Sequence, residues 1–316
     1  MLLLTEDDVR RLLPMETAIE AVEEVFRLEA SGAAENISRS RCRTERVMLH
    51  LLGGAVGPRH ALGYKAYSTG RQGANFHVGL FDGDTGKPLA LIQADALGQL
   101  RTGAASGVAT KFMARPDSEV VGLIGAGKQA RTQAWAVCRV RPVRRLRVFS
   151  RNEESRKRFA KEMTPVCQCE IEPVSRAEEA VRDMDILITA TSSKTPVLSG
   201  SWLAEGTHLC AVGSNFLDKA ELDVTTFRRA KNVIVDDKEQ AKLEAGDFVA
   251  AREEGVLHWS SIHELSEVVV GKLRGRAHAE DITVFKSLGL GIEDIAVAAR
   301  VYAAAVAGGA GREVDF

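Results

Sequence analysis

The stretch VVGLIGAGKQA, from Val120 to Ala130, decides the fold of this chain. Its first half, VVGLI, is a short apolar run of the kind that forms a buried strand. Gly125 and Gly127 permit a tight turn and leave the backbone open to close approach by a ligand. Ala130 is small enough for the next helix to pack closely on the sheet. Strand, glycine turn and helix in this order predict a Rossmann unit.

The glycine turn is expected to bind the pyrophosphate of a nicotinamide dinucleotide. Unpaired N–H groups and the positive end of the dipole at a helix N-terminus favour anionic oxygens. The glycine pattern alone is weak, because it occurs by chance in many turns, but the strand before it and the helix after it support the assignment. The expected contacts in this loop are Gly125, Ala126, Gly127, Lys128 and Gln129.

Downstream of the loop, the pattern alternates between strands and helices. Short apolar runs such as DILITAT and THLCAVG are separated by helical segments, which specifies a parallel sheet covered by helices. In this fold a cofactor binds at the carboxyl ends of the strands. Thr191, Ser192, Gly213 and Ser214 follow such strands and are expected to contact it.

The strand LRVFS ends in Ser150, Arg151 and Asn152, where an enzyme that uses NAD commonly carries Asp or Glu. A carboxylate there would repel the 2′-phosphate of NADP, whereas a hydroxyl, a guanidinium and an amide can each hold it. We therefore expect NADP(H) as the preferred cofactor and NAD(H) as the alternative. The simpler interpretation of Arg151 is a solvated residue after a strand.

The first part of the chain has a different pattern. Thr5-Glu6-Asp7-Asp8 predicts a helix start, and strand-like segments follow between Arg41 and Ala94. Two of them, FHVGLFD and PLALIQA, are joined by the turn-rich GDTGK, which predicts a hairpin in an antiparallel sheet. ALGQLRTGAASGVATKFMA predicts a helix, and GIEDIAVAARVYAAAVA predicts a final helix that packs back on this part. The predicted fold is α/β, with a Rossmann domain (117–289) and an α+β domain (1–116 and 290–316).

Composition and charge exclude several classes of protein. The 42 basic and 43 acidic residues are interleaved without a basic tail, so nucleic acid is not an expected partner. No apolar run approaches the roughly 18 residues of a membrane span, and Met1 to Leu4 is too short for a signal peptide, so we expect a cytoplasmic protein. The five cysteines lack a repeated Cys-x-x-Cys pair, which argues against disulfides and zinc. CQCEIEPV is expected to be one strand with Cys167 and Cys169 on one face, and no metal is expected.

Three basic residues outside the Rossmann domain have small or apolar neighbours: Arg41, Lys65 and Arg101. Each alone is most simply a solvated side chain. Together they predict a carboxylate pocket, because two guanidinium forks and an ammonium can grip a substrate carboxylate. His77 is a second acid–base candidate, although a single His in an alternating strand is more often structural.

The chain resembles the ornithine cyclodeaminase/mu-crystallin family over nearly its whole length. The resemblance is carried by GYKAYSTG, by RTGAASGVATKFMARPDS running into VGLIGAGKQARTQ, by AVGSNFLDKAELD and by TVFKSLGLGIEDIAVA. It implies an N-terminal substrate-binding and dimerisation domain, a Rossmann domain inserted before the terminal helix, and a homodimer. It assigns carboxylate binding to Arg41, Lys65 and Arg101. Further cofactor contacts are expected from Thr102, Ser287, Leu288 and Gly289.

The chain departs from ornithine cyclodeaminase itself at Asn215. That enzyme has an Asp there, which handles the distal amine and the ring closure, and Asn offers neither a charge nor a base. It also holds NAD tightly, whereas Ser150 and Arg151 suit NADP(H). Both differences favour the family members whose reaction consumes or produces reduced cofactor. These are NAD(P)-dependent oxidoreductases that act on CH-NH or CH-NH2 groups.

We expect reduction of an imine of a 2-oxo acid to an L-amino or imino acid, as in cyclic ketimine or pyrroline-2-carboxylate reduction or alanine dehydrogenase-like amination. Lys65 is the expected proton donor or second carboxylate ligand, with a pKa lowered by guanidinium groups and burial. Asn215 would hydrogen-bond the imine nitrogen or its water. Three alternatives stay open: the ornithine cyclodeaminase reaction from L-ornithine to L-proline and ammonia, a non-catalytic NADPH- or ligand-binding crystallin-like protein, and a condensing amino-acid synthase.

Overall fold

The computed structural model describes residues 1–315, which divide into two compact units. Unit 1 comprises Met1–Arg101 and the chain from Gly289 onward, and unit 2 is Thr102–Leu288. The sequence-based boundary lay later, between residues 116 and 117. The helix α3 (Asp95–Met113) is continuous through Arg101 and Thr102, and its second part belongs to unit 2. No helix within residues 1–315 is long and apolar enough to cross a membrane.

Unit 1 is built on a seven-stranded sheet with the order β15-β1-β6-β5-β4-β3-β2. The strands from β2 to β6 are antiparallel, and β1 pairs with β6 in parallel. Its elements are β1 (Leu2–Leu4), α1 (Glu6–Leu12), α2 (Met15–Ala30), β2 (Ala34–Arg43), β3 (Val47–Val56), η1 (Gly57–Arg59), β4 (Ala61–Gly70), β5 (Gly73–Asp82), β6 (Pro88–Gln93), the start of α3, α10 (Gly291–Gly308) and β15 (Arg312–Glu313).

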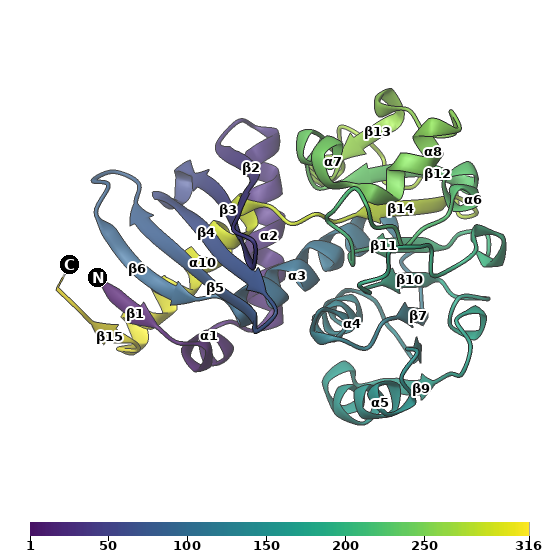
Figure 1. Cartoon of the computed structure of the whole chain (residues 1–316), viewed down its shortest axis with the longest axis horizontal. Helices are drawn as coiled ribbons and strands as arrows, with labels where there is room; N and C mark the ends of the chain where they lie inside the picture. Colours follow the sequence, from purple (N-terminus) through teal and green to yellow (C-terminus); the bar gives the residue numbers. More distant parts are fainter. Residues whose placement is uncertain (316) are drawn as a thin grey trace. The chain divides into compact units, whose positions relative to one another are not determined.

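Several sequence-based expectations for unit 1 are confirmed. Thr5 and Asp8 form a capping box at the start of α1, so the predicted helix begins where the motif lies. The strands β5 and β6 form the predicted antiparallel hairpin. The terminal helix α10 packs on the sheet of unit 1 and runs across β3, β4 and β5 (Figure 1).

The two faces of this sheet differ in what covers them. The face under α10, here called the inner face, allows close approach because Gly54 lies beneath the helix; a Cβ there would be 2.8 Å from the backbone nitrogen of Ile292. Successive side chains of a strand alternate between the faces. The outer face therefore carries the large exposed apolar side chains of the sheet: Ile37, Val47, Leu49, Leu51, Leu62, Tyr64 and Leu91.

Unit 2 is built on an eight-stranded parallel sheet with the order β13-β12-β14-β11-β10-β7-β8-β9, as the alternating pattern predicted. Its elements after α3 are β7 (Val120–Ile124), α4 (Lys128–Val140), β8 (Arg145–Phe149), α5 (Glu153–Cys167), β9 (Glu170–Pro173), η2 (Glu178–Ala180), β10 (Ile186–Thr189), η3 (Gly200–Trp202), β11 (His208–Ala211), α6 (Val224–Arg229), β12 (Ala230–Val235), α7 (Lys238–Glu244), η4 (Gly246–Phe248), α8 (Val249–Glu253), η5 (Trp259–Ser261), β13 (Ile262–Glu264), α9 (Leu265–Val269) and β14 (Ile282–Lys286).

The strand order reverses beside β7, which pairs with β8 on one side and β10 on the other. Such a switch point is where an open parallel sheet receives a ligand. The turn after β7 requires glycine at Gly125, because its φ is 118° and a Cβ would lie 2.3 Å from the carbonyl oxygen of Ala190. The identity of Gly125 is thus fixed by both backbone conformation and space.

Two local predictions for unit 2 are wrong. CQCEIEPV is not one strand: Cys167 ends α5, Gln168 adopts a left-handed φ of 55°, and β9 starts only at Glu170. The alternation of strands and helices also predicts a helix at AEEAVRD, just before DILITAT, but this segment forms only a single 3-10 turn at Glu178–Ala180. Within residues 1–315 all five cysteines are free thiols, and no group of three or more His, Cys, Asp or Glu side chains is arranged to hold a metal ion.

Candidate active site

A buried cluster of charges lies on the inner face of unit 1. Lys65, in β4, is 3% exposed, and its Nζ donates to Oδ1 of Asp294 at 2.9 Å. Arg101 donates its Nε to the same oxygen at 2.9 Å and its Nη1 to Glu293 at 2.8 Å. Both acids come from the first turn of α10 and are fully buried. Two acids that sequence reasoning missed therefore hold two of the expected basic residues.

The charges in this cluster change the proton affinity of its members. Burial lowers the pKa of Lys65 to about 8; Asp294 opposes this effect, while Arg101 and Arg39 add to it. Burial also acts to lower the pKa of Arg101, but Asp294 and Glu293 outweigh it and raise that pKa above its ordinary value. Lys65 can therefore exchange a proton near neutral pH, while Arg101 stays charged.

Two glycines make room for these long side chains. A Cβ on Gly98 would lie 2.7 Å from Nζ of Lys65, and a Cβ on Gly289 would lie 2.3 Å from Nη1 of Arg101. Gly289 also has a φ of 80°, which favours glycine. Any larger residue at these positions would displace an ammonium or a guanidinium from the cluster.

The strand β2 contributes two arginines with different surroundings. Arg41, the predicted carboxylate ligand, is half-buried and donates its Nε to Nδ1 of His50 at 3.1 Å. Arg39 is 7% exposed, donates its Nη2 to the carbonyl of Gly289 at 3.0 Å, and is the β2 arginine whose charge acts on Lys65. Sequence reasoning missed Arg39, although its spacing of two from Arg41 in SRSRCR puts both on one face. Burial, Arg41 and Arg39 lower the pKa of His50 to about 4, so its imidazole is neutral.

Aromatic rings line the inner face beside Lys65. Tyr67 stacks on Phe76 with ring centres 5.0 Å apart, and His50 stacks on Tyr67 at 4.1 Å. The ammonium of Lys65 lies 5.8 Å from the centre of the Phe76 ring. These rings form an apolar wall beside a cation, and a small amphiphilic ligand with a carboxylate could bind at such a boundary.

His77, the second acid–base candidate, lies on the outer face. The register of β4 and β5 pairs Lys65 with Val78 and Ala66 with His77, so Lys65 and His77 point to opposite sides. His77 is exposed and its ring meets the edge of Tyr64 at 6.0 Å. The expectation that His77 could serve as an acid or base beside Lys65 is therefore wrong.

Unit 2 contains a cavity of about 730 Å³ at the carboxyl ends of β7, β8, β10 and β11. The backbone of Gly127 opens into free space at the start of α4, because a Cβ there would meet nothing within 4 Å. Backbone N–H groups at this helix start can therefore receive a diphosphate, and the residues fit a dinucleotide. The expected cofactor contacts that line the cavity are Gly125, Ala126, Gly127, Lys128, Gln129, Ser150, Arg151, Thr191, Ser192 and Gly213.

The remaining expected contacts lie outside the lining of this cavity. Asn152 accepts the backbone N–H of Ser155 through Oδ1 and so caps α5. The backbone carbonyl of Thr102 accepts a hydrogen bond from Gln133. Asn215 is half-buried in the segment after β11. Ser214 is buried and donates its Oγ to two backbone carbonyls of that segment, those of Phe216 and Lys219.

Ser287 and Leu288 are held by a buried acid that sequence reasoning also missed. Asp236, 1% exposed, accepts the hydroxyl of Ser287 at 3.4 Å and the backbone N–H of Leu288 at 2.5 Å. The segment after β14 is thus fixed to the end of β12 within unit 2. The signal in the sequence was NVIVDD, a buried strand that ends in two acids.

A fourth missed acid, Glu221, fixes the loops that line the cavity. Its buried carboxylate accepts the backbone N–H of Thr191 at 2.7 Å, the backbone N–H of Gly213 at 2.7 Å and the hydroxyl of Thr189 at 3.0 Å. Burial is the main cause that raises the pKa of this carboxyl. The loops after β10 and β11 are therefore tied to one side chain.

Comparison with known proteins shows to which family the chain belongs. The model of the ornithine cyclodeaminase/mu-crystallin family matches residues 1–309. The chain belongs to this family. Alanine dehydrogenase from Archaeoglobus fulgidus is 37% identical, and the match covers 100% of this chain and 98% of that protein. The predicted resemblance is thereby confirmed.

Solved structures of the family share the whole fold. Delta(1)-pyrroline-2-carboxylate reductase from Thermococcus litoralis, solved with NADH and L-proline, gives a TM-score of 0.95 at 39% identity and covers 99% of this chain and 100% of that one. An archaeal alanine dehydrogenase dimer with bound NAD gives a TM-score of 0.94 at 34% identity and covers 100% of this chain and 99% of that one. The predicted fold, a Rossmann domain with an α+β domain, is confirmed.

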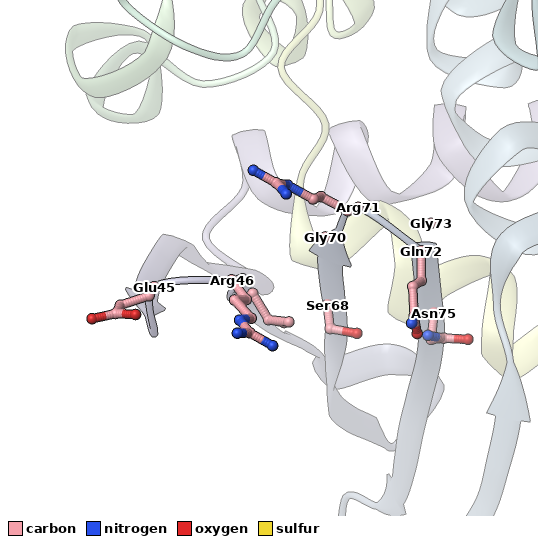
Figure 2. A pocket seen from close by; sticks show the side chains of 9 residues that line it. Glu45, Arg46, Ser68, Gly70, Arg71, Gln72, Gly73 and Asn75 are labelled. Carbon is pink, nitrogen blue, oxygen red and sulfur yellow. The ribbon is translucent and has the colours of Figure 1, made fainter.

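This family member has a second hollow, of about 670 Å³, at the hairpin ends of unit 1. Figure 2 shows Arg46 and Arg71 projecting from the hairpin loops, with Ser68 and Asn75 on the adjoining strands. Ser68 and Asn75 form a cross-strand pair. Ser68 is an odd number of residues from Lys65 along β4, so this pair lies on the outer face and Lys65 on the inner face. This hollow therefore belongs to the outer face and is separate from the charged cluster.

Proposed function

We propose that the protein uses a reduced nicotinamide dinucleotide to convert the imine of a 2-oxo acid into the corresponding L-amino or imino acid. The observation that carries this proposal is the charge of the buried cluster. The cluster brings three cations, Lys65, Arg39 and Arg101, together with two acids, Glu293 and Asp294. Guanidinium and ammonium groups gathered on one face would attract a substrate carboxylate and bind it through charge-assisted hydrogen bonds. The relatives named above, an alanine dehydrogenase and a pyrroline-2-carboxylate reductase, act on substrates of this class.

In the proposed mechanism, the arginines Arg41, Arg39 and Arg101 orient the carboxylate through charge-assisted hydrogen bonds. The ammonium of Lys65 donates a proton or acts as a further carboxylate ligand, and a pKa near 8 suits both roles at neutral pH. Asn215 hydrogen-bonds the imine nitrogen or its water. The cavity residues Gly125, Gly127 and Arg151 would hold a reduced nicotinamide dinucleotide, which would supply the hydride that the imine carbon needs.

We further propose that NADP(H) is the preferred cofactor and that NAD(H) binds less tightly. Ser150 and Arg151 both line the cavity after β8, and the lining residues include no acid. A 2′-phosphate would meet a hydroxyl and a guanidinium there, with no carboxylate to repel it. The two related structures described above contain NADH and NAD, and the preference proposed here rests on Ser150 and Arg151 of this chain.

We also propose that the chain forms a homodimer through the outer face of unit 1. Seven large exposed apolar side chains lie on that face, and a concentration of such side chains on one surface is typical of an interaction site. The dimeric archaeal alanine dehydrogenase shares the fold of the whole chain.

The test is an assay of NADPH and NADH oxidation against pyruvate with ammonia, pyrroline-2-carboxylate, piperideine-2-carboxylate and sulfur-containing cyclic ketimines. Lys65→Met should lower kcat/KM by about 100-fold or more with the best substrate, because the proton donor is lost. NADPH affinity should stay unchanged, and Lys87→Met, an exposed lysine of unit 1, serves as the matched control. Ammonia release from L-ornithine without oxidation of the reduced cofactor would instead support the cyclodeaminase reaction, and NADPH binding without any turnover would support a binding protein.

A further inference from the structure

One carboxylate oxygen joins the two buried cations of unit 1. Oδ1 of Asp294 accepts from Nζ of Lys65 and from Nε of Arg101, each at 2.9 Å. Within residues 1–315, Oδ2 of Asp294 is buried without a hydrogen-bond partner. The negative charge of Asp294 therefore acts on Lys65 through a direct contact in surroundings of low polarity, where such contacts have their largest effect.

The ionisable groups of the neighbouring elements affect Lys65 in different ways. Arg101 of α3 and Arg39 of β2 carry positive charges that disfavour the charged form of Lys65. From α10, Glu293 is directed to Arg101, so Asp294 is the acid in contact with Lys65. Further ionisable groups on this face include Arg41 and Arg43 of β2, the neutral His50 of β3 and Tyr67 of β4.

We propose that Asp294 is a positioning residue that keeps Lys65 protonated and thereby sets the upper pH limit of activity. The proposal rests on the proposed function, in which the charged form of Lys65 is the working form. Without Asp294, burial and two guanidinium groups would act on Lys65 unopposed, and the ammonium would lose its proton at a lower pH. Activity would then be lost at a lower pH as the pH rises.

The direct test is the titration of Lys65 in the full-length protein, followed by NMR of lysine labelled with ¹³C at Cε. The signal of Lys65 is assigned by its absence in Lys65→Met. The midpoint should fall by about one pH unit or more in Asp294→Asn, which removes the charge and keeps the shape. Asp294→Glu, which keeps the charge, should titrate nearer to the original protein and guards against a folding failure of Asp294→Asn.

Glu293→Gln is the matched control, because it removes a buried acid from the same helix turn that is bonded to Arg101, whereas Asp294 is the acid whose charge raises the pKa of Lys65. It should shift the Lys65 midpoint less than Asp294→Asn. In parallel, the basic limb of the kcat/KM profile against pH should move down by the same amount as the NMR midpoint in Asp294→Asn, with part of the activity recovered at lower pH.

The two readouts separate the possible failures. An NMR midpoint that stays unchanged in Asp294→Asn, or that falls equally in Glu293→Gln, would overturn the role of Asp294 even if the protein reduces imines. An NMR midpoint that falls in a protein without imine turnover would uphold the effect on the Lys65 proton and reject the proposed function. A lower midpoint with an unmoved kinetic limb would overturn the link between Lys65 and the pH limit.

Discussion

The carboxylate of Glu221 accepts the backbone N–H of Gly213 at 2.7 Å, directly beneath the loop that lines the dinucleotide cavity. The same carboxylate holds the N–H of Thr191. Asp247 accepts the backbone N–H of Glu221 at 2.6 Å and forms a fully buried ion pair with Lys286 at 3.0 Å. A chain of buried charges thus shapes two loops that touch the cavity.

Glu221→Gln should weaken dinucleotide binding. The amide places an NH2 group against one of the two backbone N–H donors, so one charge-assisted bond is lost and costs about 1–3 kcal/mol. We expect the Kd for NADPH to rise about tenfold or more, measured by titration calorimetry. Glu253→Gln, on the exposed side of α8, should leave the Kd unchanged. Equal affinities in both variants would show that the loops keep their shape without Glu221.

Gly98→Ala should separate activity from stability. Alanine favours a helix over glycine by about 1 kcal/mol, yet a Cβ here would lie 2.7 Å from Nζ of Lys65. The flexible end of Lys65 would yield and move away from Asp294, so kcat/KM should fall at least about tenfold, while Tm should change little because the helix gain of alanine opposes the cost of weakening a buried ion pair. Gly308→Ala in α10 has open space around it and should change neither kcat nor KM. Full activity in Gly98→Ala would contradict the need for a fixed ammonium.

Arg151→Gln should reduce the preference for NADP(H). Removal of the guanidinium takes away a charge-assisted partner of the 2′-phosphate, and a loss of about 1.5–3 kcal/mol corresponds to roughly a tenfold to hundredfold weaker Kd for NADPH. The Kd for NADH should change little. Arg158→Gln on the exposed side of α5 is the control. A protein that already prefers NADH before mutation would refute the cofactor proposal.

Leu51→Glu should prevent dimer formation. Leu51 is 42% exposed on the outer face of unit 1, and a charge buried in an apolar interface is strongly unfavourable. Light scattering after size-exclusion chromatography should give twice the monomer mass for the original protein and the monomer mass for the variant. Leu243→Glu is the control, because Leu243 is 59% exposed on α7 of unit 2. This variant should keep the mass of the dimer. A monomeric original protein would rule out the proposed interface.

The sequence predicts the parts of the fold that depend on neighbouring residues. The strand before Gly125 and the helix after it were expected because the turn needs a positive φ and open backbone, both local requirements. The capping box of Thr5 and Asp8 is local in the same way. The end of α5 was not foreseen, because a left-handed Gln168 is unusual for a residue with a side chain.

The site is harder to predict, because its geometry depends on contacts distant in sequence. Arg39 and Arg41 share a face by alternation, but alternation does not indicate that Arg39 is the more buried of the two and donates to the carbonyl of Gly289, a residue distant in sequence. His77 could be assigned to a face only once the register of β4 and β5 was known. Glu293 and Asp294 look like ordinary acids in the first turn of a helix, where the positive end of the helix dipole stabilises negative side chains.

The place of α10 in the chain has a consequence for biosynthesis. Unit 2 is one continuous segment, whereas unit 1 needs α10, which is translated after all of unit 2. As domains fold in the order in which they are completed, the Rossmann part can be finished on the ribosome while the N-terminal sheet still lacks its last helix. Until Glu293 and Asp294 arrive, Lys65 and Arg101 have no acids to neutralise them. The inner face of the nascent sheet also lacks its helical cover until α10 is made, and apolar surface exposed at that stage favours aggregation.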